Sequence, residues 1–187
     1  MDPDGQLIQA TLDGNSAAFG ELVRRYQDRL LSTLTHVVGS VEDAQDITQE
    51  TFVQAFVRLD SFRGASAFYT WLYRIAFNQA VTLRRRTRPS ESLDAARELR
   101  GDMLADGREG PDGRLVRGER ALQVQAALRA LSQEHRTILV LREVEGCSYE
   151  MIAEMLNLPV GTVRSRLARA RLQLRNELKD VLQEEVG

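Results

Sequence analysis

Residues 62–86 read FRGASAFYTWLYRIAFNQAVTLRRR and hold six of the eleven aromatic residues of the chain. Apolar residues recur there at intervals of three and four, which predicts a helix from Ala67 to about Arg86, capped by Ser66 and stopped before Pro89. The segment closes on three consecutive arginines. A helix that carries both rings and cations is typical of a surface that stacks on flat, anionic groups.

Four residues of this helix share one flank beside its central apolar stripe: Trp71, Arg74, Asn78 and Arg85. Together they can stack on a base, neutralise a phosphate and hydrogen-bond to a base edge, as in the binding of single-stranded nucleic acid. The preceding loop, Arg63–Ala67, has small residues and can accept an unstacked base. Two alternatives stay open. Phe68 and Trp71 are equally well explained as core residues, and Arg84–Arg86 as a solvated helix end.

The rest of the chain is patterned as helix rather than strand. It has 187 residues, 43% of them hydrophobic, with four prolines and no β-branched alternation, which predicts an all-α protein. Asn15 can cap a helix that Gly39 ends, and a second helix is predicted over Val41–Leu59. One face of that second helix is acidic and continues into valines: Glu42, Asp46, Gln49, Glu50, Val53 and Val57. Such a face repels DNA and suits a basic protein surface, although solvation alone explains its acids.

Residues 87–120 contain five glycines, two prolines and fifteen charged residues. This composition predicts a flexible linker, with a short helical turn near Leu93–Leu99. Helical patterning returns at Ala121, and Ser132 can cap a further helix. We therefore expect two small helical domains, residues 1–86 and 121–187, joined by a linker over residues 87–120.

A helix-turn-helix is predicted near the C-terminus. Ser148 can cap a two-turn helix, and Pro159 can open a second helix that runs to about Leu182. One stripe of the second helix is apolar: Val163, Leu167, Ala170, Leu174 and Leu178. Residues 160–175 hold five arginines and no acid, which favours DNA in the major groove over a merely solvated helical hairpin. The N-terminus of this helix and the Thr162 hydroxyl also suit a phosphate.

Composition excludes several function classes. The net charge of −2 argues against a globally basic nucleic-acid binder. Acidic and basic segments alternate along the chain, so basic surfaces are expected to be local. One cysteine, Cys147, and two histidines form no metal-ligand spacing, and His36 and His135 fall in separate helical segments, so we expect no metal, no cofactor and no catalytic activity. The absence of a signal peptide or a spanning apolar run predicts a cytoplasmic protein with no membrane insertion of its own.

Three segments resemble bacterial sigma factors of the extracytoplasmic-function (ECF) group in the sigma-70 family, most closely the RpoE-like type. They read DAQDITQETFVQAF at 43–56, SFRGASAFYTWLYRIAFNQA at 61–80 and LREVEGCSYEMIAEMLNLPVGTVRSRLARAR at 141–171. The resemblance covers both helical blocks, and it implies sigma region 2 in residues 1–86 and region 4 in residues 121–187. It implies a transcription-initiation subunit that binds RNA polymerase core and promoter DNA, usually held inactive by an anti-sigma factor in an envelope-stress response.

The resemblance also assigns three sets of residues. The helix over Glu42–Leu59 would dock on the β′ clamp helices through Glu42, Asp43, Asp46, Gln49, Glu50, Val53 and Gln54. The next segment would read and open the −10 element through Phe62, Arg63, Gly64, Ala65, Ser66, Ala67, Trp71, Arg74, Asn78, Arg84 and Arg85. The second helix of the helix-turn-helix would read the −35 element through Thr162, Arg164, Ser165, Arg166, Arg169 and Arg171, and region 4 would also meet the β flap.

A simple helix-turn-helix regulator that binds duplex DNA alone is the main rival interpretation. It explains residues 148–175 but not the aromatic flank or the acidic helix. The two interpretations predict different behaviour. A regulator should bind a DNA duplex without polymerase, whereas a sigma factor should need polymerase core for tight, strand-opening binding.

Overall fold

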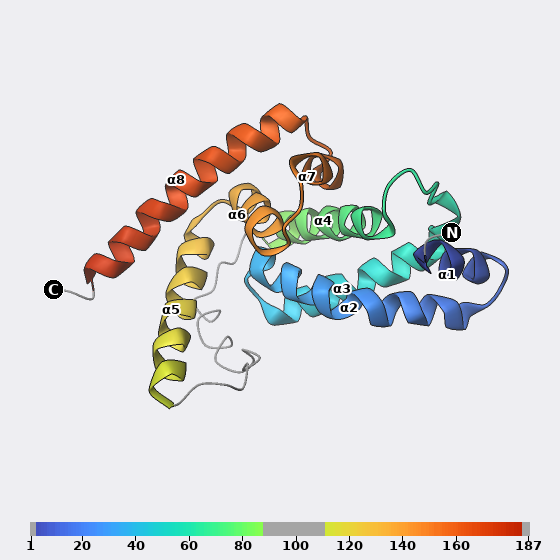
Figure 1. The fold of residues 1–187 in the computed structure, drawn as a ribbon, viewed down its shortest axis with the longest axis horizontal. Coiled ribbons are helices and arrows are strands. Elements are labelled where there is room, and N and C mark those ends of the chain that lie inside the picture. The colour runs from blue at the N-terminus through green and yellow to red at the C-terminus, as the bar shows by residue number, and fades with distance from the viewer. Residues whose placement is uncertain (1–2, 88–110, 185–187) are drawn as a thin grey trace.

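The computed structural model describes residues 3–87 and 111–184, with side chains described for 3–83 and 121–179. Every regular element in this part of the chain is helical, which confirms the all-α prediction. The elements are α1 (Pro3–Leu12), α2 (Ser16–Val38), α3 (Val41–Val57), the 3₁₀ turn η1 (Leu59–Ser61), α4 (Phe68–Thr87), α5 (Pro111–Ala130), α6 (Gln133–Leu139), the π-helical turn η4 (Val140–Val144), α7 (Tyr149–Leu156) and α8 (Val160–Glu184). Helices α1–α4 form one bundle, α6 and α7 lie against it, and α5 and α8 extend away from it (Figure 1).

The predicted helix ends are set by local capping. The Asn15 side chain accepts a hydrogen bond from the Ala17 N–H, and Gly39 ends α2 in a left-handed conformation with φ of 79°. Ser132 and Ser148 cap α6 and α7 by accepting from the backbone N–H of His135 and Met151. These polar side chains satisfy amides that have no partner within the helix. The N-caps predicted at these three positions are confirmed. The cap predicted at Ser66 is wrong, because α4 begins at Phe68 and Ala67 is the residue before it, whose carbonyl accepts from the Trp71 N–H.

Three parts of the fold differ from the sequence prediction. Helix α1 was not predicted; it is held by tertiary contacts, because its Asp4 carboxylate accepts hydrogen bonds from Arg25 and Tyr26 of α2. Helix α5 begins at Pro111, so residues 111–120 of the predicted linker are helical. The chain after α6 widens into a π turn, in which the Glu145 N–H donates to Val140 O. The turn predicted near Leu93–Leu99 and the stop at Pro89 lie outside the described residues.

One hydrophobic core runs through both halves of the chain. It includes Leu34 and Leu72 from the first bundle and Ile138, Ile152 and Leu167 from the C-terminal helices, each at most 1% exposed. Helix α4 contacts α3 and α2 on one side and α7 on the other. It therefore serves two packing surfaces at once.

We expect Ser148→Ala to lower the free energy of unfolding by about 1 kcal/mol, because the Met151 N–H would lose its side-chain acceptor at the start of α7. Urea denaturation followed by circular dichroism measures the change. Ser32→Ala, at an exposed position inside α2, is the matched control and should shift stability by less than about 0.5 kcal/mol. Equal effects of the two substitutions would contradict the capping role.

Candidate nucleic-acid interface

Helices α7 and α8 form the predicted helix-turn-helix. Asn157 ends α7 in the left-handed region with φ of 52°, and the Leu158 N–H bonds to Ala153 O. Val163, Leu167 and Ala170 of α8 are buried against α6 and α7, as the apolar stripe predicted. The opposite side of α8 is left at the surface. This arrangement presents one long helix face to a partner.

The exposed face of α8 is basic. Arg164, Ser165, Arg169 and Arg171 are exposed, while Thr162 and Arg166 are partly buried. Arg166 forms an ion pair with Glu134 at 3.0 Å, and both Nε and Nη2 of Arg171 donate to the Glu143 carboxylate. Arg164 and Arg169 form no ion pair with the side chains that the structure describes. Two of the predicted readers are therefore held by carboxylates, and two point into solvent.

The loop before α4 is open to solvent. Arg63, Gly64, Ala65 and Ala67 are exposed, and Ser66 is half-buried. Gly64 has a φ of 66°, a conformation that favours glycine. A Cβ built there would meet no atom within 4 Å. The glycine thus serves the backbone turn, and the space beside its Cα is open.

The aromatic flank of α4 is divided between core and surface. Arg74 and Asn78 are exposed one helical turn apart, as predicted. Trp71 is only 7% exposed, and its ring lies 5.4 Å from that of Phe62 and 5.7 Å from that of Phe68. Its packing follows the core alternative, so the ring does not present a face for stacking on a base in this structure. The side chains of Arg84 and Arg85 lie outside the described residues.

The acidic face of α3 is exposed as predicted. All six residues assigned to it are exposed, whereas Ala44, Ile47, Ala55 and Leu59 on the opposite side are buried. Asp43 and Gln54 lie at its edge and are half-buried. Phe56, which was not predicted, is 48% exposed beside Val53 and Val57, and its ring lies 5.1 Å from that of Phe19. Its apolar type beside Val53 and Val57, which the helical period places on the same face, was the signal in the sequence that could have identified it.

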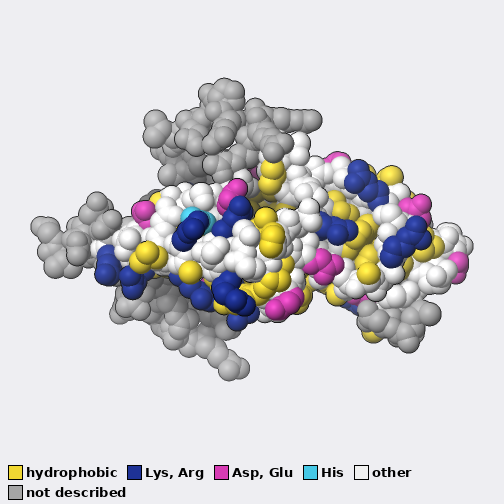
Figure 2. Space-filling view, turned by 90° about the horizontal axis from the view of Figure 1, so that it is seen from above, with side chains coloured by type: hydrophobic (Ala, Val, Ile, Leu, Met, Phe, Trp, Pro, Cys, Tyr) yellow, Lys and Arg dark blue, Asp and Glu magenta, His cyan; other side chains and the backbone are white. Residues whose placement is uncertain are grey.

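The face of the molecule seen in Figure 2 carries basic side chains at several places. Figure 2 shows this face, with Lys and Arg side chains in both halves of the view and apolar side chains between them.

No described helix is long and apolar enough to span a bilayer. Within the described residues, no cluster of three or more His, Cys, Asp or Glu side chains could hold a metal ion.

Comparison with known proteins identifies both halves. Residues 22–89 match the family Sigma-70 region 2, and residues 121–174 match the family Sigma-70, region 4. The RNA polymerase sigma-H factor of Pseudomonas aeruginosa is 40% identical over 189 residues, covering 98% of each chain. The ECF RNA polymerase sigma-E factor of Haemophilus influenzae is 40% identical over 185 residues, covering 96% of this chain and 97% of that protein.

Solved structures show the same fold. The structure of CnrH in complex with the cytosolic domain of CnrY superposes with a TM-score of 0.68 at 29% identity, covering 96% of this chain and 99% of that one. The sigma factor RpoE of Bartonella quintana, in complex with the anti-sigma factor NepR, superposes with a TM-score of 0.64 at 25% identity, covering 86% and 96%. The chain belongs to the ECF sigma factors of the sigma-70 family.

Proposed function

We propose that this protein binds RNA polymerase core, directs it to specific promoters and helps to open the −10 element, as a transcription-initiation subunit rather than an enzyme. The observation that carries the proposal is the separation of two surfaces. An acidic and apolar face on α3 lies in region 2, and an exposed basic face on α8 lies in region 4. The acidic face on α3 suits a basic surface of the polymerase, and the basic face on α8 suits the anionic backbone of a DNA duplex.

The α3 face supports docking on a basic surface of the polymerase, which we assign to the β′ clamp helices. Its acids attract such a surface, and the apolar patch of Val53, Phe56 and Val57 can be buried there. Exposed apolar side chains that lie together are otherwise costly on a soluble protein. We further propose that region 4 contacts the β flap.

Promoter recognition is assigned to two separate elements. The open loop at Gly64, together with exposed Arg74 and Asn78, supports capture of an unstacked −10 base. The exposed Arg164 and Arg169 of α8 support reading of −35 base edges in the major groove. In this proposal Trp71 supports the −10 surface from the core, because its ring packs against Phe62, the residue before the loop.

Regulation by an anti-sigma factor in an envelope-stress response is part of the proposal. Its support is that the Bartonella quintana neighbour is a sigma factor in complex with an anti-sigma factor, and that a curated relative is a sigma-E factor. Because it would act together with RNA polymerase, we propose that the protein is cytoplasmic.

Run-off transcription tests the function. Purified polymerase core is supplied with this protein on a library of candidate promoters, and we expect specific initiation that depends on the added protein. Tight duplex binding by the protein alone, with no initiation on any template, would instead support the duplex-binding regulator.

We expect Asp46→Arg to weaken binding to polymerase core, because it reverses a charge in the middle of the acidic α3 face. Co-purification with core, or fluorescence anisotropy of the labelled protein, measures the affinity. Asp28→Arg makes the same charge change at an exposed position on α2 and should leave the affinity nearly unchanged. Normal binding by the Asp46 variant would remove α3 from the core interface.

We expect Arg169→Ala to weaken promoter use through the −35 element by about 1–3 kcal/mol, the value of one bidentate base contact. Arg169 has no ion pair among the described residues, so its loss disturbs no intramolecular contact of that kind. Arg175→Ala, an exposed arginine further along α8, is the matched control. If both variants keep the same −35 preference as the original chain, the assignment of Arg169 fails.

We expect Asn78→Ala to change −10 selectivity more than binding to a duplex −35 element, because its side chain is exposed on α4 and lies in region 2. Selection from a promoter library with a randomised −10 element measures the preference. Gln27→Ala removes an exposed amide from α2 and serves as the control. An unaltered −10 preference would count against a role for Asn78 in base recognition.

A further inference from the structure

The residues predicted to read the −35 element are not equally placed around α8. At about 100° per residue, Ser165 and Arg169 lie within about 50° of the line opposite the buried apolar stripe. Arg166 and Arg171 lie about 110° from that line, on opposite sides of the helix. The exposed face of α8 therefore has a centre, and it has an arginine on either edge.

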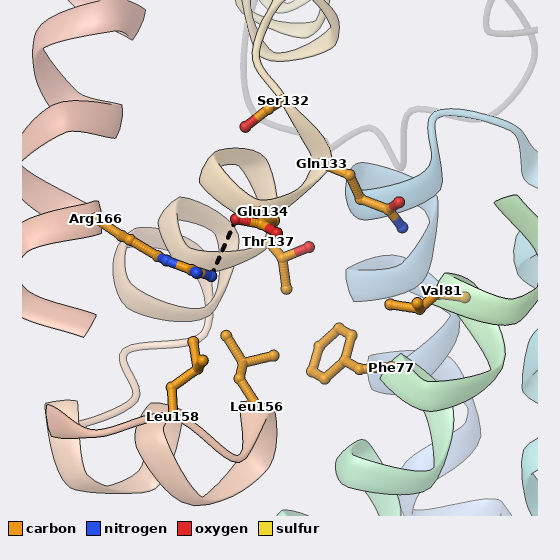
Figure 3. Close-up of a pocket in the computed structure, with 10 residues that line it drawn as sticks. Phe77, Val81, Ser132, Gln133, Glu134, Thr137, Leu156, Leu158 and Arg166 are labelled. Carbon is orange, nitrogen blue, oxygen red and sulfur yellow. Dashed lines mark ion pairs between the residues drawn. The ribbon is translucent and has the colours of Figure 1, made fainter. Parts of the chain in front are cut away.

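These two edge arginines are each paired with a carboxylate from another element. Arg166 pairs with Glu134 of α6 at 3.0 Å, and Figure 3 shows its side chain reaching from α8 toward that helix. Arg171 donates from Nε and Nη2 to one oxygen of Glu143 in the π turn, at 2.9 and 2.6 Å. Arg169, nearer the centre, forms no ion pair with the side chains that the structure describes.

The edges of the face are where a DNA duplex would present its phosphates. A major groove about 12 Å wide admits one helix about 10–12 Å in diameter. The base edges then lie before the centre of the inserted face, and the two backbones lie along its sides. Contacts to phosphate position a protein without reading sequence, whereas contacts to base edges specify it. The carboxylates of Glu134 and Glu143 therefore act on the part of the surface that carries no sequence information.

An arginine held by a carboxylate contributes little to binding a phosphate. The pair presents no net charge to the DNA, so it releases no counterion from the backbone unless it separates. Separation leaves a free carboxylate beside the anionic backbone, which repels it. The side chain of Glu134 is 69% exposed and that of Glu143 is 50% exposed. Ion pairs this open to water are weak, so removal of the carboxylate should change DNA binding more than it changes folding.

The Arg166–Glu134 pair lies at the border of a cavity rather than within a dense core. The cavity has a volume of about 580 Å³, and Phe77, Leu156 and Leu158 are among the residues that line it (Figure 3). Both glutamates are at exposed positions, so an amide in place of either carboxylate buries no new polar group. We therefore expect Glu134→Gln and Glu143→Gln to fold as the original chain does.

We propose that Glu134 and Glu143 limit the sequence-independent binding of DNA by α8, so that unrelated DNA does not hold the free chain. Selection of the promoter is then left to the centre of the face and to the polymerase. A genome offers about 10⁶–10⁹ non-specific sites, so even a small gain in affinity for each would withdraw the protein from polymerase. The proposal rests on the proposed function for this consequence, but the limit on DNA binding is a property of the chain alone.

Binding of the full chain to a labelled duplex of unrelated sequence tests the proposal. Fluorescence anisotropy gives the affinity of Glu134→Gln, of Glu143→Gln and of the double variant between about 50 and 200 mM salt. At the lowest salt we expect each substitution to raise the affinity about two- to fivefold, the range that an exposed ion pair covers. The plot of log affinity against log salt should steepen by about 0.9 for each arginine that is freed.

Two controls separate this effect from a general change of charge. Glu154→Gln removes one negative charge from an exposed position on α7, and Glu154 forms no ion pair with the described side chains. It should leave the salt dependence nearly unchanged. Adding Arg171→Gln to Glu143→Gln should cancel the gain in affinity, because the carboxylate acts through that arginine. A gain in the double variant no larger than that of Glu154→Gln would overturn the proposal. So would the absence of detectable binding by the double variant at the lowest salt.

Run-off transcription with polymerase core tests the consequence. Unrelated duplex DNA is added as a competitor, and it should inhibit the double variant at a concentration several-fold lower than it inhibits the original chain. Tighter binding to unrelated DNA with equal sensitivity to the competitor would overturn this part of the proposal. Failure of the original chain to initiate, with anisotropy as expected, would count against the proposed function and leave the role of the two glutamates standing.

Discussion

The rest of the structure depends on the burial of helix α4 from two sides. Phe68 and Leu72 are covered within the first bundle, while Tyr69 and Tyr73 face the contact with region 4. A helix that is apolar around most of its circumference has to be enclosed. Its rings therefore bring α7 and the π turn onto the first bundle, and the exposed faces of α3 and α8 are the faces left over.

Charge is divided along the chain in a way that follows this packing. The acids of α3 and the arginines of α8 both lie opposite buried apolar stripes, so each surface is displayed by the same helical period that builds the core. Glu134 and Glu143 pair with Arg166 and Arg171 and moderate the basic face from within region 4. A net charge of −2 is thus compatible with two surfaces of opposite sign.

The sequence predicted correctly those features that depend on residues within one helix. The caps at Asn15, Ser132 and Ser148 are local hydrogen bonds within a few residues, and the stripe through Val163 and Leu167 is a local periodicity. It did not predict features that depend on contacts with a second helix. Helix α1 is held by Asp4 contacts to α2, which no period within residues 3–12 reveals.

Trp71 illustrates the limit within the candidate site. The helical period placed it with Arg74 and Asn78 on one flank, but period gives only the direction of a side chain around the axis. Phe62, from the chain before the loop, and Phe68 pack against the ring, which is buried. The two polar neighbours further along the flank have no such cover and remain exposed.

The sequence by itself determined the helical class, the helix caps at Asn15, Ser132 and Ser148, the acidic and basic faces and the membership in a family. Only the tertiary structure decided that region 4 rests on region 2, and that Glu145 accepts hydrogen bonds from Arg29, Thr33 and Tyr69 across that contact. The physical reason is separation along the chain. Arg29 and Tyr69 lie 116 and 76 residues from Glu145, and a helical period states which face is apolar without stating which surface will cover it.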